Sequence, residues 1–479
     1  MSRKANYPPP EERRKYVRTA TINVTRKMKR DLIKNIGVAD EVVRIIKQYL
    51  PCLIPELSKL TDKRNQGYVE YHIKVIMFVQ ILGYVVGSKS MKEMVSTFNK
   101  EIYVENVKNI LKEEIEDIPH YDTINDVLKE VSVEELRKVI KKIVYEFIRK
   151  KMFDKHRAFG KYFQIIIDGT GLCSFKKRHC EHCLTKEHKD KETGEITSIT
   201  YYHYVLEAKL CVGNMVISID TEFVENENEN VKKQDCELKA FKRMAERIKK
   251  EFPRLPIMIT GDALYACKPV MDICRENKWE YTLRFKNDRI PTLGEEIREM
   301  EEGKLLQEKT KRILKDSHSK EQIEQLYKYG NEIHVGNGTN SDEGYEVNLV
   351  KFYETKEEKT TEFMWITSIK ITTNKVEGVV NTGRKRWKIE NEGFNEQKHW
   401  TFNIEHLYST DWNAMKIHYL LTQIAHMIRQ LLEHGSSVLK ETHWFTRTEI
   451  SNIIAEQLTT IVLACDNMII WKQLRFEHY

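Results

Sequence analysis

The stretch Tyr162-Phe-Gln-Ile-Ile-Ile-Asp-Gly-Thr170 decides the fold, because it carries one carboxylate at the end of a short apolar run. Its β-branched residues predict a buried strand, since the run is too short for a helix of its own. Asp168 then stands where the strand is expected to end, and Gly169 allows the backbone to turn away. A rigid strand can fix a metal ligand, although an aspartate that only caps a turn has the same sequence pattern.

A second stretch, Pro256-Ile-Met-Ile-Thr-Gly-Asp262, repeats this design further along the chain. Again an apolar strand ends in a carboxylate. A pair of divalent ions held about 3.5–4 Å apart needs several oxygen ligands. A two-ion site at these aspartates would therefore need a third acidic residue.

The composition describes a soluble globular protein with a heavily charged surface, because 41% of its 479 residues are hydrophobic and 32% are charged. The formal net charge of +7 is modest for a chain of this length. The length itself suggests about three domains. The nine cysteines show no disulfide-like spacing and the basic N-terminus has no apolar signal segment, so a cytoplasmic location is expected. The longest apolar stretch, Ile73–Val86, contains a lysine and is too short to span a bilayer.

The regions before and after the middle of the chain are predicted to be helical or flexible. Residues 1–35 are dense in arginine and lysine and predict a basic flexible arm, either a nucleic-acid contact or a solvated tail. Residues 36–157 have apolar side chains at three- and four-residue spacings, which predicts a helical region that either binds DNA or serves as a scaffold. Residues 436–479 predict a C-terminal helical extension.

The middle of the chain predicts an α/β fold with a mixed sheet. Residues 158–290 give three strands in a meander and then helix, strand, helix and strand. No dinucleotide or Walker glycine pattern is present, so a nucleotide cofactor is not indicated. Residues 291–372 predict an insertion, with a charged helical part (Leu293–Tyr329) and then a β-hairpin. Residues 373–435 are expected to complete this domain with helices.

The charged segment Asn374–Trp400 supplies the third acid. Arg386 and Glu390 are four residues apart and share one face of a predicted helix, whereas two positions along a helix rotate by about 200°. Glu392 and Glu396 therefore point elsewhere, and Glu390 is the best geometric match. The alternative for this helix is an ordinary ladder of surface ion pairs.

Together these motifs resemble a DDE insertion-sequence transposase over about residues 160–435. The run Arg386-Trp-Lys-Ile-Glu-Asn-Glu-Gly-Phe-Asn-Glu-Gln-Lys398 is similar to the branch with a Tyr-Arg-Glu-Lys signature. The resemblance implies a ribonuclease-H-like core with a β-rich insertion. It also implies Asp168, Asp262 and Glu390 as ligands of two Mg²⁺ or Mn²⁺ ions, with Arg386 and Lys398 contacting DNA.

The function that this resemblance implies is endonucleolytic cutting of the ends of a mobile element and their joining to target DNA. The partners would be double-stranded DNA and a second copy of the chain, in a homodimer or larger synaptic complex at the nucleoid. The alternatives are a nuclease without strand transfer and a DNA-binding regulatory protein that has lost catalysis. Two departures, Gly383 in place of tyrosine and Gln397 in place of lysine, put a hairpin-forming route of excision in doubt.

A second cluster lies between the first two strands, where Cys180-x-x-Cys183 has the spacing of half a zinc site. The alternative is a loop with reduced cysteines. Residues that could complete a zinc site are His188 or His179, with Cys173 or His203 as a fourth ligand. Basic neighbours indicate DNA contact in either case, and these are Lys176, Lys177 and Arg178.

Overall fold

The computed structural model describes residues 37–463, apart from 178, 315–321, 336–343, 358, 437–438 and 440–444. The predicted basic arm at residues 1–35 lies outside the described part, as does the end of the C-terminal extension. Among the described residues, no helix is both long enough and apolar enough to cross a membrane.

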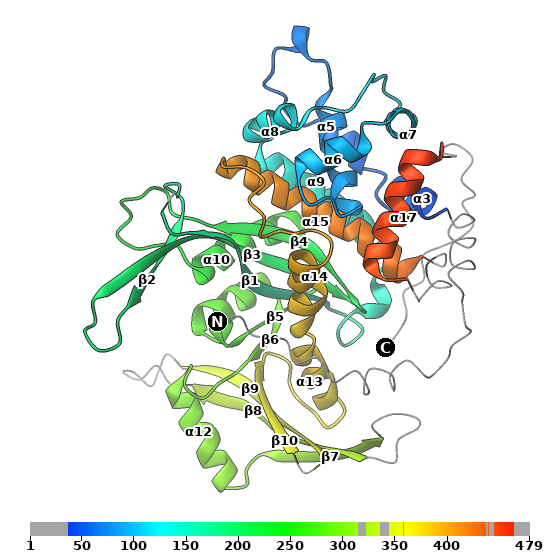
Figure 1. Ribbon diagram of the computed structural model, residues 1–479. Helices are drawn as coiled ribbons and strands as arrows, with labels where there is room; N and C mark the ends of the chain where they lie inside the picture. The colour runs from blue at the N-terminus through cyan, green and yellow to red at the C-terminus, as the bar shows by residue number, and fades with distance from the viewer. Residues whose placement is uncertain are drawn as a thin grey trace, which may run out of the picture.

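A single mixed sheet of ten strands runs through the described part of the molecule (Figure 1). Its order is β2-β3-β1-β5-β6-β10-β9-β8-β7, and β4 pairs with β3 beside this path. The strands are β1 (Phe163–Phe175), β2 (Leu184–Lys189), β3 (Ile196–Val212), β4 (Met215–Val224), β5 (Ile257–Gly261), β6 (Glu280–Arg284), β7 (Gln307–Leu314), β8 (Gln322–Val335), β9 (Tyr345–Lys356) and β10 (Lys359–Thr367).

Five of these strands form the ribonuclease-H-like core that the resemblance implied. β1, β3 and β4 are antiparallel neighbours, whereas β5 and β6 continue the sheet in parallel to β1. Parallel strands need long crossovers, and here these are the helices α10 (Glu237–Glu251) and α11 (Lys268–Asn277). The first half of β1 is fully buried, as expected for a central strand covered on both faces. The predicted mixed α/β fold is thus confirmed.

The predicted β-hairpin of the insertion is present as β9 and β10, and it extends the core sheet because β10 pairs with β6. Only its first part is helical, as α12 (Pro291–Glu302), so the predicted helical part over Leu293–Tyr329 is wrong beyond that point. Burial in β8 alternates along the chain, with Ile323 and Tyr327 on the covered face. The more exposed positions Glu324, Leu326 and Lys328 alternate with the buried ones, which is the two-residue period of a half-exposed strand.

Helices of the N-terminal region pack around the long helix α15 (Trp412–Gly435), which lies between them and the sheet (Figure 1). The innermost is α5 (Ile73–Val85), which is buried along nearly its whole length. The others are α3 (Val38–Tyr49), α4 (Leu53–Leu57), α6 (Met91–Phe98), α7 (Glu101–Leu111), α8 (Tyr121–Glu130) and α9 (Val133–Arg149). Near the C-terminus, α17 (Arg447–Thr460) packs against α3 and α7.

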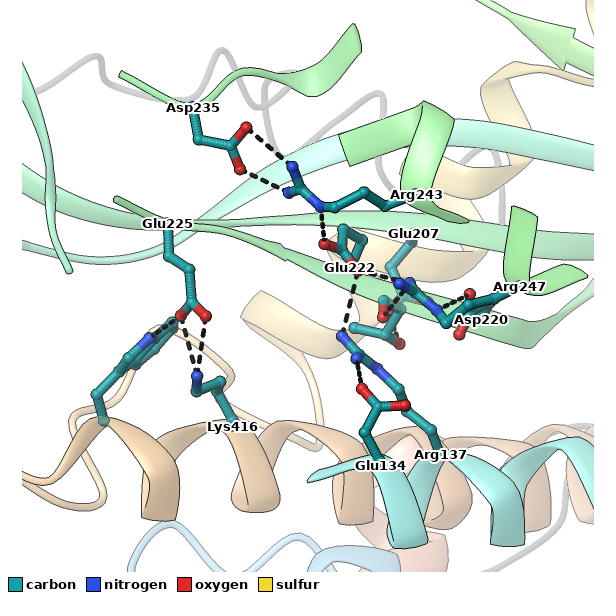
Figure 2. Close-up of polar contacts among 12 residues, drawn as sticks. Glu134, Arg137, Glu207, Asp220, Glu222, Glu225, Asp235, Arg243, Arg247 and Lys416 are labelled. Atoms are coloured by element: carbon teal, nitrogen blue, oxygen red, sulfur yellow. Dashed lines mark hydrogen bonds and ion pairs between the residues drawn. The ribbon is translucent and has the colours of Figure 1, made fainter. Parts of the chain in front are cut away.

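A cluster of charged side chains joins this helical region to the sheet (Figure 2). Glu222 of β4 accepts from Arg243 at 2.5 Å and pairs with Arg247 of α10 at 2.5 Å. The same carboxylate lies 3.4 Å from Arg137 of α9. Arg247 also pairs with the buried Asp220 at 3.0 Å. Acidic side chains of one buried strand thereby connect α9 and α10.

Candidate active site

The two strand-borne aspartates meet at one edge of the core. β1 and β5 run parallel with Ile166 opposite Thr260, so the same register brings Asp168 opposite Asp262. Asp262 follows the end of β5, and its carboxylate accepts a hydrogen bond from the Leu264 amide at 2.8 Å. β1 itself continues to Phe175, so the expected strand end at Asp168 is wrong.

Asp168 is held by an arginine from the distant helical segment. Nη1 of Arg386 donates to Oδ2 of Asp168 at 3.2 Å, and the Gly169 amide donates to Oδ1 at 3.0 Å. Burial nevertheless raises the pKa of Asp168 to about 6, although Arg386 acts in the opposite direction. The negative charges of Asp262 and Glu237 raise this pKa further. Asp168 is therefore close enough to both other carboxylates to be repelled by them.

Glu237 is an acidic residue of this site for which the sequence gives no signal. It is the first residue of α10, and its sequence pattern is that of the start of an ordinary amphipathic helix. The hydroxyl of Tyr204 donates to its Oε1 at 2.9 Å, and the hydroxyl of Tyr265 donates to its Oε2 at 2.8 Å. Tyrosines from β3 and from the turn after β5 thus fix this carboxylate beside Asp168.

Two glycines make room for these tyrosines. A Cβ atom at Gly169 would lie 2.5 Å from the ring of Tyr204, and one at Gly261 would lie 2.9 Å from the ring of Tyr265. Gly169 pairs with Leu206 within the sheet, so its expected role in turning the backbone away is wrong. The missing side chain matters because the aromatic rings need that space.

The segment that carries Glu390 packs against β1 but is not one continuous helix. The helix α13 (Val376–Arg384) ends before Arg386, and a π-helical turn, η5 (Ile389–Phe394), precedes α14 (Asn395–His399). Ile389 lies in one apolar cluster with Ile166 of β1. Packing of these two isoleucines brings the predicted third acid to the strand that carries Asp168.

Of the three glutamates in η5 and α14, only Glu390 is free to act at the site. Glu392 pairs with Lys388 at 3.0 Å, and the buried Glu396 pairs with His426 at 3.2 Å. Among the described residues, nothing forms a hydrogen bond or ion pair with the side chain of the half-buried Glu390. No hydrogen bond or ion pair joins it to either aspartate in the part of the chain that the structure describes.

Both departures from the Tyr-Arg-Glu-Lys signature have a structural reason. A Cβ atom at Gly383 would overlap the indole of Trp365, so this position cannot carry the tyrosine of the signature. Gln397 is fully buried, and its amide donates to Gln423 at 2.8 Å and bonds with His426 at 3.1 Å. Both positions are therefore buried in the interior, and neither lies on a surface that could contact DNA phosphates.

The other residues predicted to contact DNA lie in different surroundings. Lys398 pairs with Glu405 at 2.8 Å, and its side chain is largely covered. Lys176 and Lys177 are exposed just beyond the end of β1, whereas Arg178 lies outside the described residues.

The cysteine cluster contains both cysteines of the predicted half-site and His203, which was one of the candidates for the fourth ligand. The structure brings together Cys180, Cys183 and His203, whose ligand atoms all lie within 4.8 Å of one another. His188 is not among them, because it lies on β2 and bonds to Thr200 at 2.9 Å. Burial and the charge of Cys180 together raise the pKa of Cys173 to about 12. Cys173 lies on β1 at the register shift opposite His203.

The acidic site fits the divalent cations that the resemblance implies. Its ligand atoms are carboxylate oxygens, which suit Mg²⁺ or Mn²⁺ better than softer metals. Asp168 is partly buried beside two other acids, so a bound cation would relieve the repulsion that raises its pKa.

Comparisons with known proteins agree with this geometry. Residues 214–428 match the family model described as a transposase DDE domain, and residues 54–144 match one described as DDE_Tnp_1-associated. The longer match includes Asp262 and Glu390, and Asp168 precedes it. The chain belongs to the DDE transposases, which confirms the resemblance noted in the sequence. The protein is accordingly a transposase enzyme.

Among solved structures, the chain is similar to a piggyBac transposase in a synaptic complex with hairpin DNA. The similarity covers 87% of this chain and 82% of that one, at 13% identity and a TM-score of 0.38. No curated protein matches the chain.

Proposed function

We propose that this transposase cuts the ends of a mobile element and joins them to target DNA at a site built from Asp168, Asp262 and Glu390. The observation that supports this assignment is the parallel pairing of β1 and β5, which brings the two aspartates to the same edge. Arg386 pairs with the first of them and stands four residues before Glu390.

Mg²⁺ or Mn²⁺ ions bound by these carboxylates would activate a water or a DNA 3′-hydroxyl and stabilise the leaving oxygen. Asp168 and Asp262 bind from a rigid sheet, which keeps their positions fixed. Glu390 comes from the segment that Ile389 anchors on β1. The guanidinium of Arg386 lies beside the same site, where it can neutralise a DNA phosphate.

The same residues would serve strand cleavage and strand transfer, because both are in-line displacements at phosphorus. Such reactions depend on positioning and charge neutralisation more than on covalent help from the protein. Joining two element ends to one target requires both ends in one assembly, so the active form is a homodimer or larger complex on double-stranded DNA. The exposed Lys176 and Lys177 supply positive charge for that DNA.

The test is a cleavage and joining assay with DNA that carries the inverted repeats flanking the coding region. Wild-type protein with Mg²⁺ should release element ends and join them to a second duplex. The variants Asp168→Asn, Asp262→Asn and Glu390→Gln should reduce both products to background, because each neutralises one metal ligand. Glu392→Gln is the matched control, since this carboxylate pairs with Lys388, and it should retain activity.

Other results would change the conclusion in defined ways. Nicked DNA without joined products would identify a nuclease, and DNA binding without cleavage would identify a regulatory protein. Full activity of Glu390→Gln would exclude Glu390 as the third acid and make Glu237 the next candidate, because it is the other acidic residue close to Asp168.

A further inference from the structure

The cysteine cluster between β1 and β3 has the geometry of a metal site distinct from the acidic one. Sγ of Cys180 lies 3.8 Å from Sγ of Cys183, and Nε2 of His203 lies 3.4 Å from each sulfur. A tetrahedral zinc ion with bonds of about 2.3 Å to sulfur and about 2.0–2.1 Å to nitrogen holds two sulfurs about 3.8 Å apart. The same ion holds each sulfur about 3.5 Å from the nitrogen. All three observed distances agree with these values to within about 0.2 Å.

A disulfide does not explain this arrangement. The two sulfurs are well beyond the bonding distance of about 2.05 Å, and both cysteines are free. The ligand set of soft sulfurs and one imidazole in a tetrahedral arrangement is typical of zinc. Mg²⁺ and Mn²⁺ prefer oxygen ligands, so this cluster does not compete with the acidic site for its ions.

A fourth ligand is available from a bulge in β1. Gly171 pairs with Tyr204 and Ser174 pairs with Tyr202, so two β1 residues, Leu172 and Cys173, lie opposite the single residue His203. Such bulges redirect side chains, and they often occur next to functional sites. The Cys173 thiol lies outside the 4.8 Å group, so it must move inward to complete the site.

The surroundings of the cluster hold its ligands in place. The Asn226 side chain donates to the carbonyl of Cys183 at 2.9 Å, which anchors the turn between the two cysteines to the end of β4. The ring of His203 stacks on Trp412 with centroids 3.6 Å apart and planes 11° apart. Nδ1 of His203 is buried and has no partner among the described residues, which leaves Nε2 as the nitrogen that faces the sulfurs.

We propose that Cys180, Cys183 and His203 bind one zinc ion, with Cys173 as the fourth ligand. Binding converts the cysteine thiols to thiolates and releases their protons to solvent. The ion would fix the base of the β2–β3 hairpin, which projects from the sheet (Figure 1), to the start of α15. This proposal is independent of the proposed function, because no step of DNA cleavage involves the zinc ion.

The first measurement is the metal content of the full chain purified after growth with added zinc. Elemental analysis should find about one zinc per chain. Cys183→Ser and His203→Asn should each lose it, whereas the controls Cys52→Ser and His188→Asn should keep it, because neither residue is in the cluster. A wild-type protein without zinc, or ligand variants with the full amount, would overturn the proposal.

A second measurement uses wild-type protein alone, in case the ligand variants fail to fold. Cobalt added to the metal-free chain should give the absorption of a tetrahedral thiolate complex, and zinc should displace it. The absence of that absorption would overturn the proposal. In a competition with a chelator, Cys173→Ser should release zinc more readily than wild type, and unchanged release would exclude Cys173 as a ligand.

Two further observations separate this inference from the proposed function. Asp168→Asn should keep its full zinc content although it does not cleave DNA, and active protein without zinc would refute the zinc site alone. Removal of zinc should also increase protease cleavage within residues 184–199, and unchanged cleavage would refute the role assigned to the ion at the hairpin base.

Discussion

Arg386 donates a hydrogen bond to Asp168 at 3.2 Å, although the two residues are 218 positions apart in the chain. Arg386 lowers the pKa of Asp168 and so opposes the larger effect of burial. This contact therefore connects the helical segment that carries Glu390 to the strand that carries the first aspartate.

Replacement of this arginine should impair DNA cleavage. Arg386→Gln removes the positive charge beside Asp168, so the carboxyl group becomes harder to ionise and a phosphate contact is lost. We expect a loss of about 10- to 100-fold in the cleavage rate. The matched control is Arg384→Gln on the same segment, because Arg384 pairs with Glu354 at 3.0 Å, away from the aspartates. Equal activity of both variants would refute the role assigned to Arg386.

The space above Gly169 should be essential for stability. Gly169→Ala places a methyl group 2.5 Å from the ring of Tyr204, so we expect a loss of about 1–3 kcal/mol in the free energy of unfolding. Gly171→Ala in the same strand is the control, because nothing lies within 4 Å of its Cβ position. Denaturant unfolding of both variants measures the difference. An equally stable Gly169→Ala protein would show that the tyrosine can move aside.

Introducing the tyrosine of the signature at position 383 should destabilise this protein. Gly383→Tyr forces a large side chain into the space of the Trp365 indole, and we expect a loss of about 1–3 kcal/mol or more. Asn381→Tyr is the control, since that position on α13 is exposed. Thermal unfolding compares the two proteins. A stable Gly383→Tyr variant would contradict the structural reason given for this departure.

The charged cluster in Figure 2 should stabilise the packing of α9 and α10 on β4. Arg247→Met leaves the buried Asp220 without its arginine and Glu222 with fewer partners. Breaking a buried ion pair by removing one partner costs about 3–5 kcal/mol. Denaturant unfolding should show a loss of this size, whereas Arg149→Met, which breaks a surface pair with Glu146, should change little. A similar result for both variants would mean that the cluster adds no stability.

The buried His418 should make the protein sensitive to acid. Burial lowers the pKa of His418 to about 3, below the value of 6.5 for an exposed histidine. The unfolded chain therefore takes up a proton below pH 6.5 that the folded chain does not, and stability falls as the pH decreases toward 3. This one group contributes a slope of about 1.4 kcal/mol per pH unit in that window.

The test is the pH dependence of unfolding in His418→Gln. This variant keeps a polar side chain beside Tyr84 but cannot take up a proton, so its stability should fall less steeply below pH 6.5. Replacement of the exposed His399 by glutamine should leave the slope unchanged. An unchanged slope in His418→Gln would show that other groups cause the acid sensitivity.

The sequence alone determined the elements that depend on local patterns. The isoleucine run before Asp168 and the apolar run before Asp262 both formed strands, because β-branched residues favour extended backbone. The transposase class also followed from these strands and from the Arg386–Lys398 run, and the family match confirms it. The alternating burial of β8 was missed, because its charged residues resembled a helical surface.

Only the tertiary structure decided which distant side chains meet. Glu237 joined the two aspartates because tyrosines from β3 and the turn after β5 hold it there. His203, which the sequence indicated only as a possible fourth ligand, lies beside the two cysteines, whereas His188 on β2 bonds to Thr200. Register and packing depend on contacts between residues that are far apart in the chain, so the local spacing of residues does not predict which side chains meet.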